Sequence, residues 1–191
     1  MASKPGERKA QIIQSLADML EQPRAARITT AALAAHMQLS EAALYRHFAS
    51  KAQMFDSLIE AIETTLANDI QQIKQDEPRG LAQVRRIIAT LIAFAEENRG
   101  MTRVLTGDAL VTEDPRLQER LNHIDERIQA SLKQSLRTAI SDGGLPERAN
   151  PADYASLLTH FVLGRWLRYA HSGWRAIPSE RLDEQLDIML R

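Results

Sequence analysis

Residues 27–48 read RITTAALAAHMQLSEAALYRHF, and this stretch decides how the whole chain is interpreted. Thr29 or Thr30 can N-cap a short helix, because a threonine hydroxyl accepts a hydrogen bond from the free N–H groups of the first helical turn. The chain is expected to turn near Gln38, and Ser40 can N-cap a second short helix in the same way. The stretch therefore predicts two short helices joined by a tight turn.

Apolar residues in this stretch supply the contacts that would hold the two helices together. Leu33 and Ala34 are expected to face inward from the first helix. Leu44 and Phe48 are four residues apart, so they share a face and can fix the second helix to the core. Such a pair is the helix-turn-helix of DNA-binding proteins, whose second helix lies in the major groove. The pattern also fits two packed helices with ordinary caps and no binding role.

The residue types of the second helix suit contacts with base edges. Ala42 and Ala43 are small, which lets the backbone approach the bases and offers methyl contacts to thymine. Glu41 can accept a hydrogen bond from a cytosine amino group, or it can complement the helix dipole.

Other polar residues of the stretch suit contacts with phosphates, which position a protein on DNA without specifying sequence. Side chains at 45, 47 and 51 can donate to phosphates, and hydroxyls or helix N-terminal amides at 29, 30 and 40 can do the same. The predicted DNA-binding residues are Thr29, Thr30, Ser40, Glu41, Ala42, Ala43, Tyr45, Arg46, His47 and Lys51.

Apolar residues elsewhere recur with the helical period. The longest stripe predicts a helix of about 20 residues, or roughly 30 Å. It consists of Met54, Phe55, Leu58, Ile59, Ile62, Leu66, Ile70 and Ile73. Similar stripes fall within residues 12–20, 81–92, 117–140 and 182–190. No alternating strand pattern occurs, so the sequence predicts an all-α fold with about nine helices.

Helix boundaries are marked by a few local signals. Asp114-Pro115 and Asn150-Pro151 each place a capping side chain before a proline at the first helical position. Gly143-Gly144 is expected to end the helix that starts at Pro115. The helix over 81–92 is expected to end near Asn98 and Gly100, with the glycine just beyond it. A short helix is expected over 101–110.

Composition narrows the class of protein. The 191 residues include no cysteine, which excludes disulfides and thiolate metal sites. The net charge of −1 divides into +3 over residues 1–55 and −4 over the rest, as expected if one end contacts a polyanion. Residues 1–8 lack a signal-peptide pattern, and no apolar run approaches the roughly 20 residues needed to span a bilayer. We expect a cytoplasmic, nucleoid-associated protein that does not enter membranes.

Catalytic signals are missing from the sequence. His160 and His171 lie about 16 Å apart along one predicted helix, too far to share a metal. There is no phosphate-binding glycine motif and no nucleophile elbow. We therefore expect no enzyme, cofactor or metal site. Phe161, Arg165, Trp166 and Tyr169 can line a small-molecule cavity, or can equally be core or dimer-interface residues.

The residues that predict the helix-turn-helix also resemble a known family. Thr29-Thr30, the run from Ser40 to Phe48, Ser50-Lys51 and Phe55 are similar to the signature of TetR-type regulators. The resemblance implies an all-α homodimer with a three-helix DNA-binding head, residues 1–52, and a helical dimerisation and regulatory body, residues 53–191. The helices beginning near Pro115 and Asn150 would form the dimer seam. The heads would enter successive major grooves of a pseudo-palindromic site, roughly 34–36 Å apart.

A closer resemblance is to the nucleoid occlusion factors within that family. The runs Met54–Glu60, Leu105–Leu110 and Arg116–Ile128 carry it into the body. It implies binding to double-stranded DNA sites scattered over the chromosome. It also implies capture of the C-terminal tail of the division protein FtsZ in a groove between the fourth and fifth helices, which inhibits FtsZ assembly over the nucleoid.

The groove positions depart from that pattern. Phenylalanine, arginine, leucine and arginine of the pattern are replaced here by Ala61, Asp69, Thr90 and Glu97, while Asn98 matches. Acidic residues in place of cations weaken the capture of an acidic peptide. Two functions therefore stay open, a nucleoid occlusion factor and a ligand-responsive TetR-type repressor whose ligand would lie near Trp166.

Overall fold

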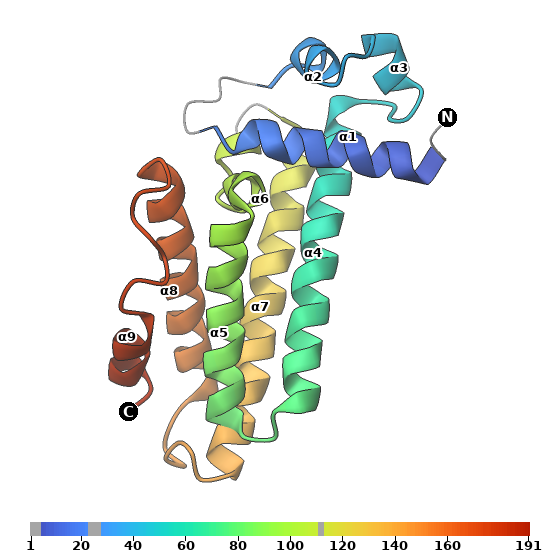
Figure 1. Ribbon diagram of the computed structural model, residues 1–191. Helices are drawn as coiled ribbons and strands as arrows, with labels where there is room; N and C mark the ends of the chain where they lie inside the picture. Colours follow the sequence, from blue (N-terminus) through green and yellow to red (C-terminus); the bar gives the residue numbers. More distant parts are fainter. Residues whose placement is uncertain (1–4, 23–27, 111–112) are drawn as a thin grey trace.

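The computed structural model describes residues 5–22, 28–110 and 113–191, and these ranges contain nine α-helices, one short 3₁₀ helix and no strand (Figure 1). The all-α prediction is confirmed. None of the helices in these ranges is long and apolar enough to cross a membrane. The elements are α1 (Pro5–Leu20), α2 (Thr30–His36), α3 (Glu41–Tyr45), α4 (Lys51–Asp76), α5 (Gly80–Glu97), α6 (Arg99–Leu105), η1 (Asp108–Leu110), α7 (Pro115–Ser141), α8 (Pro151–His171) and α9 (Leu182–Met189).

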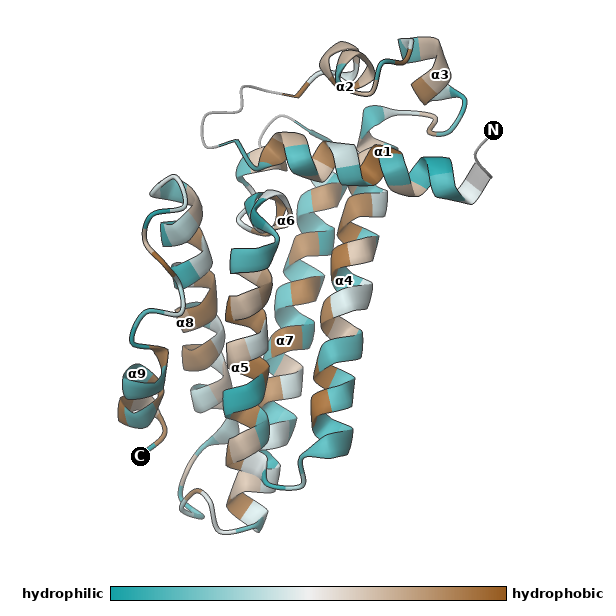
Figure 2. Cartoon of the chain, in the orientation of Figure 1, coloured by the Kyte–Doolittle hydropathy of each residue, from teal (hydrophilic) through white to brown (hydrophobic). Residues whose placement is uncertain are grey.

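The helices form a small head on a longer bundle. α1 lies across the end of the bundle, with α2 and α3 beyond it, while α4, α5, α7 and α8 run side by side beneath (Figure 1). Apolar and polar residues recur as stripes along the long helices (Figure 2). The apolar stripes meet in one continuous core that runs through both the head and the bundle.

Helix α4 connects the two parts. All eight residues of the predicted stripe, from Met54 to Ile73, are buried. The helix starts with a variant of the capping box: Ser50 Oγ accepts from Gln53 N (3.1 Å), and Gln53 Oε1 accepts from the N–H of Ala49, the residue before the N-cap (2.7 Å). The expected boundary between residues 52 and 53 falls in the first turn of this helix.

Most predicted helix boundaries are confirmed. Asp114 Oδ1 accepts from Arg116 N and Asn150 Oδ1 from Ala152 N, both at 3.0 Å, so each side chain caps the helix that its proline begins. Helix α7 ends at Ser141, and Gly143 has a φ of +79°, a backbone conformation that favours glycine.

The expected end of this helix near Asn98 is confirmed, but the role expected for Gly100 as the residue just beyond the helix is wrong. Asn98 ends α5, and Gly100 lies inside α6, where a Cβ atom would stand 1.9 Å from the carbonyl oxygen of Ala17. Glycine is required because α6 packs directly against the backbone of α1. The single short helix expected over 101–110 is also divided, into α6 and η1.

Two side chains of the bundle fix the end of α1. Arg103 Nη1 donates to Gln22 O (2.7 Å), and Trp174 Nε1 donates to Glu21 O (2.6 Å). Glu21 and Gln22 directly follow Leu20, the last residue of α1, so these bonds hold the chain where it leaves the helix. Trp174 has a φ of +66° and packs edge-on against Tyr169, with ring centroids 5.0 Å apart. The head is therefore held to the bundle by packing and by hydrogen bonds.

We predict that Gly100→Ala lowers the free energy of unfolding by about 2 kcal/mol or more, because the new methyl group must push α1 away from α6. Thermal unfolding measured by circular dichroism checks this. Gly6→Ala is the matched control, since nothing lies within 4 Å of its Cβ position. That change should be neutral or slightly stabilising. Equal unfolding temperatures for the two variants would contradict the proposed close contact.

Candidate nucleic-acid interface

The helix-turn-helix forms as its sequence predicts. Thr29 Oγ1 accepts from Ala32 N (3.1 Å) at the start of α2, and Ser40 Oγ accepts from Ala43 N (3.2 Å) at the start of α3. Gln38 adopts a left-handed backbone with a φ of 55°, which reverses the chain between the helices. Leu39 N then donates to Ala34 O (2.8 Å) and closes the turn.

Buried residues fix α3 against the rest of the head. Leu33, Ala34 and Leu44 are all buried, as predicted. Phe48 is buried too, but it lies beyond the last residue of α3, Tyr45, and not within the helix as expected. α3 is therefore anchored to the head at its C-terminal end.

The outward face of α3 carries most of the predicted base-contacting residues. Glu41, Ala42, Tyr45 and Arg46 are exposed. Ala43 and His47 are half-buried. A short, exposed helix that bears small and polar side chains can enter a groove of DNA, and the head does not need to change its conformation first.

A hydrogen-bonded chain links α2 to α3 on this face. Thr30 Oγ1 donates to Glu41 Oε2 (2.6 Å), and Tyr45 Oη donates to Thr30 Oγ1 (3.4 Å). These bonds orient Glu41 and Tyr45 relative to each other before any ligand is present. Arg27 and Arg24, at the edge of the motif, lie outside the described residues.

Lys51, the predicted phosphate contact at the start of α4, has a partner within the chain. Its Nζ lies 2.5 Å from Glu113 Oε1, and the side chains are only 18% and 8% exposed. The same ammonium group stands 5.4 Å from the centre of the Phe55 ring. A phosphate must therefore compete with a carboxylate for this cation.

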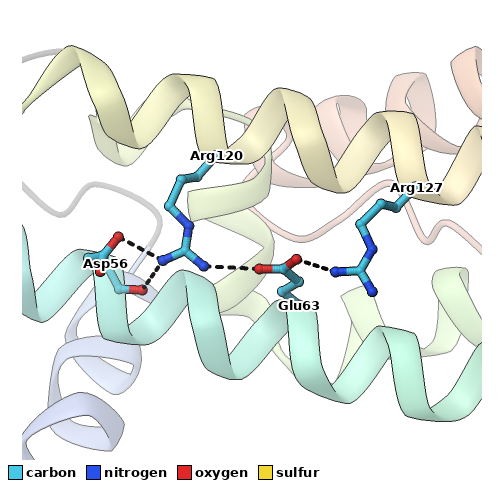
Figure 3. Close-up of polar contacts among 4 residues, drawn as sticks. All are labelled: Asp56, Glu63, Arg120 and Arg127. Atoms are coloured by element: carbon cyan, nitrogen blue, oxygen red, sulfur yellow. Dashed lines mark hydrogen bonds and ion pairs between the residues drawn. The ribbon is translucent and has the colours of Figure 1, made fainter.

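Charged side chains also connect α4 to α7 (Figure 3). Arg120 donates to Asp56 Oδ1 (2.7 Å) and to Glu63 Oε2 (2.9 Å), and Arg127 donates to the other oxygen of Glu63. Burial raises the pKa of Glu63, but the hydrogen bonds from the two arginines outweigh it and hold the pKa below its ordinary value. The network fixes the register of α4 against α7.

Residues predicted for a partner groove gather between α4 and α5. Asp69, Thr90, Glu97 and Asn98 line one open cavity of about 430 Å³. Ala61 is exposed on α4 outside this lining.

Trp166 lies elsewhere, in the core. Its side chain is fully buried, and its Nε1 donates to Leu91 O (3.1 Å). Tyr169 is buried as well, and its hydroxyl accepts from Arg99 Nε (3.1 Å). This favours the interpretation of the two aromatic residues as core residues.

Three polar contacts of the head were not foreseen. Glu113, Arg103 and Trp174 each bond to a group more than 60 residues away in the sequence. No local pattern marks such a partner. The capping box of α4, by contrast, could have been found from the spacing of Ser50 and Gln53.

The sequence matches two family models and many relatives. Residues 19–58 match the model of bacterial regulatory proteins of the tetR family. Residues 79–191 match SlmA-like_C, a tetracyclin repressor-like C-terminal domain. The nucleoid occlusion factor SlmA of Marinomonas sp. (strain MWYL1) is 43% identical over 99% of this chain and 96% of its own length. That of Cronobacter sakazakii (strain ATCC BAA-894) is 47% identical over 95% and 92%.

Solved structures share the fold at low identity. The fatty acid degradation regulator FadR from Bacillus halodurans superimposes with a TM-score of 0.80 at 10% identity, covering 100% of this chain and 97% of its own. The TetR family transcriptional regulator PfmR from Thermus thermophilus gives 0.77 at 19% identity, covering 95% and 97%. The solved structures share the fold, and the family models and the relatives place the chain in the TetR family of bacterial regulatory proteins and, within it, among the SlmA-type nucleoid occlusion factors.

Proposed function

We propose that the chain acts as a nucleoid occlusion factor, a sequence-specific DNA-binding homodimer of the cytoplasm and nucleoid. The observation that carries the proposal is the combination of an exposed helix-turn-helix with a body that is similar to SlmA over residues 79–191. Residues 1–52 would bind DNA, and residues 53–191 would dimerise and engage a partner. The role requires no catalysis, cofactor or metal.

In this proposal α3 reads the bases. Ala42 and Ala43 would contact base edges, with Glu41, Tyr45, Arg46 and His47 around them. The capped starts of α2 and α3, at Thr29, Thr30 and Ser40, would contact phosphates through hydroxyls and free amides.

Lys51 would add a phosphate contact only after leaving Glu113. The exchange costs the free protein an ion pair that is largely sheltered from solvent. Glu113 therefore opposes DNA binding, although it lies in the body and outside the motif.

We predict opposite effects for the two partners. Lys51→Ala should weaken binding to all DNA sequences equally and reduce the slope of log affinity against log salt by about 1. Glu113→Gln should strengthen binding about two- to five-fold, because the lysine no longer needs to be released. Fluorescence anisotropy with labelled duplexes over a salt series measures both.

Lys133→Ala is the matched control, because it removes the same charge from α7. The assignment of Lys51 would be wrong if Lys51→Ala altered base preference and left the salt slope unchanged. Weaker binding by Glu113→Gln would show that the pair supports the DNA-bound state.

The outward face of α8 supports the proposed dimer. Leu157 is 51% exposed and Leu167 is 42% exposed, and both share this face with Gly164. No atom lies within 4 Å of the Cβ position of Gly164. Glycine inside a helix costs about 1 kcal/mol relative to alanine, so its presence here fits the close approach of a second backbone.

We predict that Leu157→Lys weakens self-association about 100-fold, because the change would place an unpaired charge in the interface of both copies. Sedimentation velocity over a concentration series measures this. Tyr45→Lys is the matched control, since Tyr45 is similarly exposed (47%) but lies in the head. If both variants dimerise alike, α8 is not the interface.

The partner that this role implies is the C-terminal tail of FtsZ, held between α4 and α5. A map of bound sites in the native host, by crosslinking and sequencing, tests the role as a whole. We expect dozens of sites spread over the chromosome and sparse near the replication terminus. One or two sites beside a transporter or enzyme operon would instead indicate a ligand-responsive repressor.

A further inference from the structure

Another cavity lies on the side of α4 that faces α7, in the crevice between these two helices. It has a volume of about 140 Å³. An apolar cavity of about 150 Å³ holds one benzene molecule, so this one admits a ligand of about six carbon atoms. Its wall is formed by four buried side chains, Leu66 and Ile70 of α4 and Ile124 and Ile128 of α7. The wall is therefore suited to an apolar tail.

The end of this cavity nearer to the head is polar but already neutralised. Glu63 and Arg127 line it. Arg120 donates to one oxygen of Glu63 (2.9 Å), and Arg127 donates to the other (Figure 3). Charged groups that satisfy each other in this way attract a further charge only weakly. This end of the cavity therefore gives a ligand no reason to carry a second charge.

The end farther from the head carries a cation without a counter-ion. Lys74 is half-buried, and its Nζ donates to Oε1 of Gln134 (3.0 Å), a neutral group. Among the described residues this is the only polar partner of Lys74. Glu63 lies about three turns earlier, or about 16 Å along α4, too far to compensate the charge. Burial lowers the pKa of Lys74, because the ammonium group loses hydration that no anion replaces.

Two neutral side chains beside Lys74 can complete a site for an anion. Ser131 lines the cavity one turn before Gln134 on α7, and Gln71 lines it one turn before Lys74 on α4. Within the described ranges, neither side chain has a hydrogen-bond partner. An ammonium group, a hydroxyl and an amide N–H are all donors to carboxylate oxygens. The far end of the cavity therefore offers donors and a positive charge.

We infer that the cavity between α4 and α7 binds a small monocarboxylate with a hydrocarbon tail, about six carbon atoms in all. The carboxylate would accept from Lys74 and Ser131, and the tail would cover the apolar wall. An amine would add a second positive charge beside Lys74, and a dicarboxylate would bury a charge against the wall. The inference goes beyond the proposed role in nucleoid occlusion, which does not depend on a small ligand.

Three soluble compounds test the inference on the full chain. Hexanoate has both the charge and the tail, hexanamide has the same tail without the charge, and acetate has the charge without the tail. Methyl ¹H–¹³C shifts of protein labelled at isoleucine and leucine locate the binding, and their titration gives affinities. We expect hexanoate to shift the methyl groups of Leu66, Ile70, Ile124 and Ile128. It should bind about ten-fold or more tightly than either other compound.

Three variants separate the charge from the cavity. Lys74→Met keeps an unbranched side chain but removes the ammonium group, so hexanoate and hexanamide should bind equally. Lys133→Met is the matched control, because it removes the same charge from a half-buried position of α7 outside the lining, and it should keep the preference for hexanoate. Ala67→Leu fills the cavity from its own lining and should abolish the binding of both compounds.

The inference is overturned if hexanoate shifts none of the four methyl-bearing residues of the wall, or binds no more tightly than hexanamide. It is also overturned if Lys74→Met keeps the preference or if Ala67→Leu still binds hexanoate. None of these results affects the proposed binding of DNA, because no predicted DNA-binding residue lines the cavity.

Discussion

Helix α4 buries one unbroken stripe from Met54 to Ile73, and this burial ties the DNA-binding head to the bundle. Its first turns pack against α1, and the rest of the helix packs against α5 and α7. All of these contacts are made by one helix of 26 residues, which is about 39 Å long. A change in the tilt of α4 would therefore move the start of the helix, next to α3, and the groove beside α5 together. The DNA-binding surface of the head and the groove beside α5 are therefore connected through α4.

The charges of α4 are distributed according to what each side of the helix faces. Toward α7, Asp56 and Glu63 are neutralised by Arg120 and Arg127, and the contact is structural (Figure 3). Toward α5, Asp69 has no partner among the described residues. At the N-terminus, Lys51 is held by Glu113 but can be exchanged. Paired charges fix the helix in place, while unpaired or exchangeable ones are suited to recognition.

Local signals explain what could be predicted from the sequence. The caps at Thr29, Ser40, Asp114 and Asn150 act within a few residues of their own position, and apolar periodicity depends only on the helix that contains it. Gly100 was misassigned because its reason is a distant backbone that only the folded chain brings near. The ion pair of Lys51 could not be predicted for the same reason, because its partner Glu113 is distant in the sequence. The groove residues were named from the family resemblance, but only the folded chain shows that Asp69 and Glu97 have no hydrogen-bond or ion-pair partner among the described residues.

The contact between Trp174 and the end of α1 has a spectroscopic consequence. The chain contains two tryptophans. Trp166 is sealed in the bundle core, whereas Trp174 bonds to a carbonyl group of the segment that follows α1. Indole emission is sensitive to such a hydrogen bond and to the water that replaces it. Trp174 is thus a natural fluorophore at the junction of head and body. Trp166, shielded in the core, serves as an internal reference.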